Sequence, residues 1–145
     1  NHPENGVISF FKEIFTLEQL ARNRMERAFP NDMKVSHFTA LSYLVKKDTP
    51  SSPAELASAF QVSRPTMTNT LQKLEAKNYI CVSADLEDGR GKLVMITQEG
   101  KNAFHIAVQS LAEMFGDVAN AMGEEPFKEA LIPLTSIRAF MDVSR

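Results

Sequence analysis

The chain has little of the residues that carry most enzyme and metal chemistry. Its 145 residues include one cysteine, three histidines and no tryptophan. A single cysteine cannot form a disulfide within the chain, and no cysteine–histidine pair has the spacing of a zinc site. Glycine-rich phosphate loops, the nucleophile elbow of hydrolases and the HExxH zinc motif are also absent from the sequence. We therefore expect no enzyme activity, no cofactor and no metal site.

Long hydrophobic runs and a large excess of either charge are missing as well. No apolar run approaches the roughly 18–20 residues of a membrane span, so we expect no membrane partner. The formal net charge is −2, which disfavours a general polyanion binder but allows a local basic patch. The length fits one domain over residues 1–145, and the single cysteine fits a reducing, cytoplasmic compartment.

Residues 51–77 carry the signals of two helices joined by a tight turn. Ser52 and Glu55 have the spacing of a capping box, with Pro53 at the first helical position between them. Ser63 then supplies a hydroxyl that can cap the second helix. This order of signals predicts a helix-turn-helix.

The second of these helices, expected from about Arg64 to Lys77, has two different faces. Its inward face is apolar and consists of Met67, Leu71 and Leu74. Its other face carries short polar side chains and one cation: Pro65, Thr66, Thr68, Asn69, Gln72 and Lys73. Amides can pair with adenine in the major groove of DNA, and hydroxyls can contact bases or phosphates. The alternative is an ordinary solvated helix face.

A β-hairpin is predicted directly after this helix. Two β-prone segments, residues 79–83 and 92–96, flank an acidic tip that contains glycine. Arg90 is the one long cation of this tip, and Asp85 or Asp88 can hold its guanidinium in a fixed orientation. The alternative is a surface hairpin whose ion pair has no function.

The terminal segments predict helices with more apolar surface than one subunit can bury. Apolar residues recur at helical spacing over residues 7–29 and again over residues 98–142. In the second segment, Thr97 can cap the first turn, and Pro133 should kink or split the last helix. A further helix between these segments can be capped by Ser36. The large apolar surface favours a homodimer.

In element order and in several motifs, the chain resembles the MarR (multiple antibiotic resistance) family of bacterial transcription regulators. The matching motifs are LA at 56–57, VS at 62–63, TMT at 66–68, LQKLE at 71–75 and DLEDGRGKLVMITQEG at 85–100. The resemblance implies a mainly α fold of about six helices with a small antiparallel β wing. It also implies a winged-helix region over about residues 34–97, between dimerisation helices at about 7–29 and 98–142.

The resemblance implies a function as well: a homodimeric repressor or activator, with a repressor expected, that binds an inverted repeat in double-stranded DNA. In that family the fourth helix reads the major groove and a wing arginine enters the minor groove. The matching DNA-binding positions are Ser63, Arg64, Pro65, Thr66, Thr68, Asn69, Lys73, Arg90 and Lys92, with Asp85 and Asp88 orienting the wing. A small aromatic effector, held by Arg22 or His37 in a pocket between the first, second and fifth helices, would release the DNA.

The chain departs from the family pattern where cations are usual. An arginine common in the middle of the reading helix is Asn69 here, and one common in the first wing strand is replaced near Cys81. Residues 51–97 hold five cations and five anions, although phosphate neutralisation supplies much of DNA affinity. The alternative function is therefore a winged-helix interaction or ligand-binding module without DNA binding. Cys81 itself is expected to be buried and inert.

Overall fold

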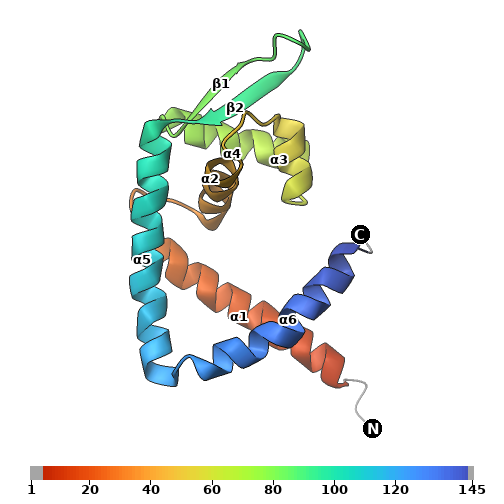
Figure 1. Cartoon of the computed structure of the whole chain (residues 1–145), viewed down its shortest axis with the longest axis vertical. Coiled ribbons are helices and arrows are strands. Elements are labelled where there is room, and N and C mark those ends of the chain that lie inside the picture. Colours follow the sequence, from red (N-terminus) through yellow and green to blue (C-terminus); the bar gives the residue numbers. More distant parts are fainter. Residues whose placement is uncertain (1–4, 144–145) are drawn as a thin grey trace.

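The computed structural model describes residues 5–143, and their helices and strands confirm the predicted fold class. The elements are α1 (Gly6–Ala28), α2 (Val35–Lys47), α3 (Pro53–Ala59), α4 (Arg64–Ala76), β1 (Ile80–Ala84), β2 (Lys92–Ile96), α5 (Gln98–Met122) and α6 (Glu125–Val143). Six helices and a small antiparallel sheet therefore make up the described chain (Figure 1). Among the three histidines, His2 lies outside the described residues.

The winged-helix region surrounds one compact core. β1 pairs with β2 in antiparallel register, with Ile80 opposite Ile96, and Ser51 adds an isolated bridge to Val94. The largest fully buried apolar side chains come from the loop before α2, from α2, α3 and α4, and from β2: Met33, Leu41, Leu44, Leu56, Leu74 and Val94. Because α4 contributes to this core, its orientation relative to the sheet is fixed by packing.

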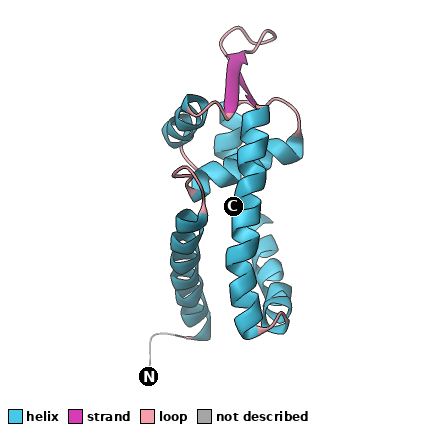
Figure 2. Ribbon diagram, turned by 90° about the vertical axis from the view of Figure 1, so that its left-hand side faces the viewer, coloured by secondary structure: helices cyan, strands magenta, loops and turns pink. Residues whose placement is uncertain are grey.

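The remaining helices extend away from this core. α5 runs from the base of the wing to the far end of the molecule, where the chain turns into α6 (Figures 1 and 2). α1 packs against α5 and α2, whereas neither α1 nor α6 contains a single buried residue among those described. No helix in residues 5–143 is long and apolar enough to cross a membrane.

Three of the predicted helix caps are confirmed. The hydroxyls of Ser52, Ser63 and Thr97 each accept the backbone N–H three residues along the chain, at 3.1, 3.2 and 3.0 Å respectively. Each bond satisfies one of the donors that a helix N-terminus leaves free. The beginnings of α3, α4 and α5 are thus set by local sequence.

The predicted cap of α2 by Ser36 is wrong. The helix already begins at Val35, because Glu26 of α1 accepts the Val35 N–H at 2.8 Å. His37 supports the same end, since its Nδ1 accepts the Lys34 N–H at 3.2 Å. The start of α2 is therefore determined by a carboxylate nine residues earlier in the chain, which a local pattern does not reveal.

Of the kink or split predicted at Pro133, the split does not occur, because α6 continues as one helix through this residue. A proline inside a helix removes the hydrogen bond to the carbonyl four residues earlier. That carbonyl belongs to Glu129, whose surroundings are exposed, so water can satisfy it. The loss of this one hydrogen bond therefore does not interrupt the helix.

Candidate nucleic-acid interface

α4 presents one face to the core and the other to solvent. Met67, Thr70, Leu71 and Leu74 are buried against α2, α3 and the sheet. The predicted DNA-reading positions lie on the opposite side and are all exposed: Ser63, Arg64, Pro65, Thr66, Thr68, Asn69 and Lys73. Gln72 is exposed with them. The structure therefore brings the polar residues of this helix together on one accessible face.

Hydroxyl groups organise the first turns of α4. Ser63 Oγ accepts the Thr66 N–H at 3.2 Å and donates to Thr66 Oγ1 at 2.8 Å. Thr70 Oγ1 donates to the Thr66 carbonyl at 3.2 Å. The Ser63 hydroxyl is consequently used within the protein, whereas the Thr66 hydroxyl proton remains available to an external acceptor.

The tip of the wing is held by carboxylates that bond to the backbone. Asp85 accepts the Glu87 N–H at 3.0 Å, and Asp88 accepts the Arg90 N–H at 3.2 Å. Within residues 5–143, no ion pair joins Arg90 to either carboxylate. Asp85 and Asp88 thus shape the loop that carries Arg90 rather than contacting its guanidinium, and the side chains of Arg90 and Lys92 are exposed.

A side-chain cluster that the sequence did not predict fixes α3 to α2. Tyr43 of α2 donates its hydroxyl to Glu55 of α3 at 2.8 Å, and Lys47 forms an ion pair with the same carboxylate oxygen. The hydrogen bond from Lys47, together with that from Tyr43, lowers the pKa of Glu55. Because α3 packs against α4, this cluster helps to hold the exposed face of α4 in place.

The C-terminal end of α4 is anchored as well. Lys77 Nζ donates to the carbonyl of Asn31 in the α1–α2 loop at 2.6 Å. Asn78 follows with a positive φ of 62°, the left-handed conformation expected where the helix ends. α4 and the wing lie at one end of the molecule, next to each other in Figure 1, and these contacts hold α4 in place.

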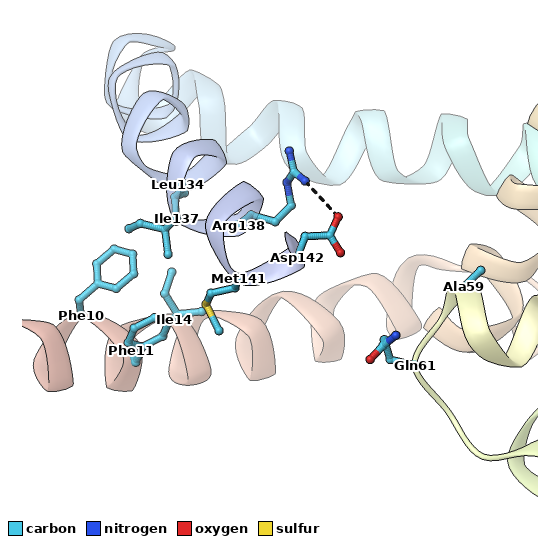
Figure 3. Close-up of a pocket in the computed structure, with 10 residues that line it drawn as sticks. All are labelled: Phe10, Phe11, Ile14, Ala59, Gln61, Leu134, Ile137, Arg138, Met141 and Asp142. Atoms are coloured by element: carbon cyan, nitrogen blue, oxygen red, sulfur yellow. Dashed lines mark ion pairs between the residues drawn. The ribbon is translucent and has the colours of Figure 1, made fainter. Parts of the chain in front are cut away.

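A second candidate surface lies at the other end, between α1 and α6. A cavity of about 580 Å³ separates these helices and is lined by Phe10, Phe11, Ile14, Ala59, Gln61, Leu134, Ile137, Arg138, Met141 and Asp142. Figure 3 shows aromatic and aliphatic side chains of α1 and α6 directed into the space between the two helices. Large apolar side chains are also exposed along these helices and α5, among them Phe15, Leu20, Ile106, Leu131 and Ile132. Large apolar side chains exposed together on neighbouring helices are typical of a surface that binds another protein chain.

Comparison with known proteins matches the winged-helix region to a family. The model of the MarR family matches residues 31–91, which span α2 to the wing tip. Residues 31–91 are a MarR-family winged helix. No curated protein matches the chain.

Solved structures with the same fold cover nearly the whole chain. A cysteine-to-serine mutant of MarR from E. coli, complexed with operator DNA, has a TM-score of 0.79 and 18% identity over 94% of this chain and 99% of that one. The S. aureus MepR–DNA complex has a TM-score of 0.72 and 22% identity over 90% of this chain and 96% of that one. BpsR from Bordetella bronchiseptica, whose DNA binding is regulated by 6-hydroxynicotinic acid, has a TM-score of 0.75 and 15% identity over 90% and 98%. At these identities the likeness shows the fold.

The two predicted ligand residues lie in different places. Arg22 pairs with Glu18 at 2.6 Å and lines a cavity of about 400 Å³ between α1, α2 and the helix-turn-helix. Thr66 and Met67 of α4 line the same cavity. His37 does not line it, and this site also lies away from the expected position between the first, second and fifth helices.

His37 instead occupies a buried position near the end of α4. Only 6% of its surface is exposed. Burial is the main cause that lowers the pKa of His37, and the nearby cations Lys77 and Lys73 lower it further. Its imidazole therefore supports the start of α2 in the neutral form and is poorly placed to bind an anion from solvent.

The expectation of a buried Cys81 is wrong. Side chains alternate across β1, so Ile80 faces the core while Cys81 faces solvent. A two-stranded sheet is covered on one face only, and the strand pattern did not identify which residues would face outward. Within residues 5–143, no three histidine, cysteine, aspartate or glutamate side chains are grouped so that they could hold a metal ion.

Proposed function

We propose that this chain is a DNA-binding transcription regulator that acts by occupying its operator, most simply as a repressor. The observation that carries the proposal is the exposed polar face of α4 beside a wing with an exposed arginine, within a MarR-family winged helix. Proteins of the same fold have been solved with DNA, in one case operator DNA. The function is binding, and its output is the fraction of time for which the operator is occupied.

Each group of exposed side chains has a role in this proposal. Pro65, Thr66, Thr68 and Asn69 enter the major groove, where side chains distinguish base pairs. Arg90 enters the adjacent minor groove. The cations Arg64, Lys73 and Lys92 neutralise phosphates, which supplies affinity without sequence preference. Ser63 contributes by fixing the start of α4 through its cap.

The regulator acts as a homodimer formed through α1, α5 and α6. Uncovered apolar side chains on all three helices, together with the cavity between α1 and α6, support this assembly. A two-fold dimer presents two copies of α4 related by symmetry, so its operator is an inverted repeat. Half-sites about one helical turn apart let both copies enter the major groove on one side of the duplex.

A small aromatic acid in the cavity lined by Arg22 is the proposed effector. The guanidinium would bind the carboxylate, in competition with Glu18, and Phe60 and Val62 would contact the ring. Because Thr66 and Met67 line the same cavity, an occupant would contact the recognition helix directly and shift the spacing of the two α4 helices.

Arg22→Gln should abolish the response to a panel of phenolic acids while leaving DNA binding intact. If no compound in the panel raises the melting temperature of the protein or releases DNA from it, phenolic acids are excluded as effectors.

One observation favours a second function. The cations and anions of residues 51–97 are equal in number, so the region has no formal net charge to attract DNA. A winged helix of this kind can act instead through protein contacts or a bound small molecule. This alternative predicts no preference for duplex DNA over single strands and no sequence preference.

Binding-site selection on random duplexes separates the two functions. The purified protein is mixed with a library of random duplexes, each long enough for two half-sites, and bound molecules are amplified over several rounds. Enrichment of one inverted repeat would support the regulator, and recovery of an unenriched library would support the interaction module. A variant with Asn69 and Arg90 both replaced by alanine is the matched control, because both side chains are exposed and the fold should be unchanged.

A further inference from the structure

The exposed face of α4 contains two amide side chains whose hydrogen-bonding groups are unused. Within residues 5–143, no hydrogen bond engages the side chains of Thr68, Asn69 or Gln72. By contrast, the neighbouring Ser63 and Thr66 hydroxyls bond to each other. Asn69 and Gln72 thus present complete amide groups, each with donors and an acceptor, to whatever approaches α4.

The spacing of these two amides suits neighbouring base pairs. Residues three apart lie on the same side of a helix and are separated by about 4.5 Å along its axis. Successive base pairs are about 3.4 Å apart. A helix lying obliquely in the major groove can therefore place the two amides at adjacent base pairs, or at base pairs separated by one position.

The chemistry of this face selects between the two kinds of base pair. Asparagine and glutamine form bidentate pairs with adenine N6 and N7, whereas arginine and lysine form them with guanine O6 and N7. Residues 65–72 contain no charged side chain, so guanine has no bidentate partner over the central part of the face. The methyl group of Thr68, which directly precedes Asn69 in sequence, can contact the methyl group of thymine.

We propose that Asn69 and Gln72 require A·T base pairs at the centre of each half-site, and that Asn69 is the principal specificity residue. This inference rests on the proposed DNA-binding function and adds the class of sequence that is bound. It also explains how a reading region with no net charge selects a site: discrimination comes from the bases while phosphate contacts stay few.

The test compares the sequences selected by the parent protein and by Asn69→Arg. The parent should select A·T pairs at two central positions of each half-site. Asn69→Arg should change the preferred base at one of them from adenine to guanine, with about a tenfold change in relative affinity between the two duplexes. Gln72→Ala should relax preference at the other position and leave the first unchanged.

Asn120→Arg is the matched control, because it makes the same chemical change at an exposed position near the far end of α5. It should select the same sites as the parent. Selection of G·C pairs at the half-site centre, or an unchanged preference in Asn69→Arg, would overturn this inference while leaving the regulator in place. Failure of the parent to enrich any sequence would instead overturn the proposed function itself.

Discussion

Gly100, in the first turn of α5, lies directly against the backbone carbonyl of Tyr79, the residue that precedes β1. A Cβ atom on Gly100 would lie 2.1 Å from that oxygen and 2.8 Å from Ile96 Cγ1. The oxygen cannot move freely, because it also accepts the Thr97 N–H at 3.0 Å. The start of α5 is therefore in close contact with the turn that connects α4 to the wing, and this contact needs a residue without a side chain.

Replacing Gly100 by alanine should lower the free energy of unfolding by about 1–3 kcal/mol, the usual cost of forcing extra atoms into a packed site. Gly116→Ala is the control, because a Cβ atom there would meet no heavy atom within 4 Å. It should be neutral, or stabilising by up to about 1 kcal/mol, since alanine favours a helix more than glycine does. Urea denaturation followed by circular dichroism measures both. Equal stability of the two variants would contradict the close contact at Gly100.

Local signals predicted most of the fold from the sequence. Hydroxyl caps and apolar periodicity act over three to seven residues, so Ser63 and the Met67–Leu71–Leu74 face could be identified without a structure. The acidic tip and flanking strands of the wing were found in the same way. The motif ending in Gly100 suggested a family, and the structure shows why glycine is needed there.

The features that the sequence could not predict depend on contacts between distant residues. Glu26 sets the start of α2 from another helix, and Tyr43 reaches Glu55 across the α2–α3 interface. Exposure of Cys81 depends on which face of the sheet the helices cover. For the candidate site, the sequence predicted that Asn69 lies on the outward face of its helix, but only the structure shows that its amide makes no hydrogen bond within residues 5–143.

His37 should make the stability of the protein depend on pH. Burial, Lys77 and Lys73 lower the pKa of His37 below its ordinary value of 6.5, while Glu26 opposes this shift and Lys34 adds to it. The folded state therefore binds fewer protons than the unfolded state at pH values between the two pKa values. The contribution of His37 to stability is complete above about pH 6.5 and falls as the pH decreases toward the lowered pKa of the folded state. Protonation would also remove the acceptor of the Lys34 N–H.

The measurement is the free energy of unfolding between about pH 5 and pH 8, the range in which histidine titrates, for the parent and for His37→Gln. Glutamine does not titrate, and its amide oxygen can accept the same N–H, so the variant should lose stability less steeply on acidification. His105→Gln controls for loss of a histidine as such, because His105 is an exposed residue of α5. An equally steep decline in His37→Gln would show that other groups cause the pH dependence.

The apolar surfaces of α1 and α6 should make the protein dimeric at micromolar concentration. Phe15 is 67% exposed and Leu131 is 55% exposed in a single chain. Burying such side chains favours association, and a charge in their place must be desolvated on association. Light scattering should therefore give a dimer mass for the parent and a monomer mass, or a dimer weakened by about tenfold or more, for Phe15→Glu and Leu131→Glu.

Leu86→Glu is the control for this experiment. Leu86 is 96% exposed, but it lies at the wing tip, away from the proposed dimer surface. Its replacement adds the same charge to an apolar position and should leave the dimer mass unchanged. A monomeric parent would contradict the homodimer, and the inverted-repeat operator would then lose its structural basis.

Arg90 should contribute to DNA binding in a way that depends on the sequence flanking each half-site. Minor grooves of A·T-rich DNA are narrow and have an enhanced negative potential, which attracts an inserted arginine. Arg90→Ala should therefore weaken binding to sites with A·T-rich flanks by about tenfold, and binding to sites with G·C-rich flanks much less. Equal losses of affinity on both kinds of site would indicate that Arg90 contacts a phosphate and does not enter the minor groove.

Salt dependence gives an independent measure of the same arginine. Each neutralised phosphate changes the slope of log affinity against log salt concentration by about 0.9 for duplex DNA. A dimer loses two arginines in Arg90→Ala, so the slope should become shallower by about 2 on a site with A·T-rich flanks. Lys46→Ala removes the same charge from an exposed position near the end of α2, outside the proposed DNA-binding and dimer surfaces, and should leave the slope unchanged. If both variants alter the slope equally, the effect comes from overall charge, and the wing does not enter the groove.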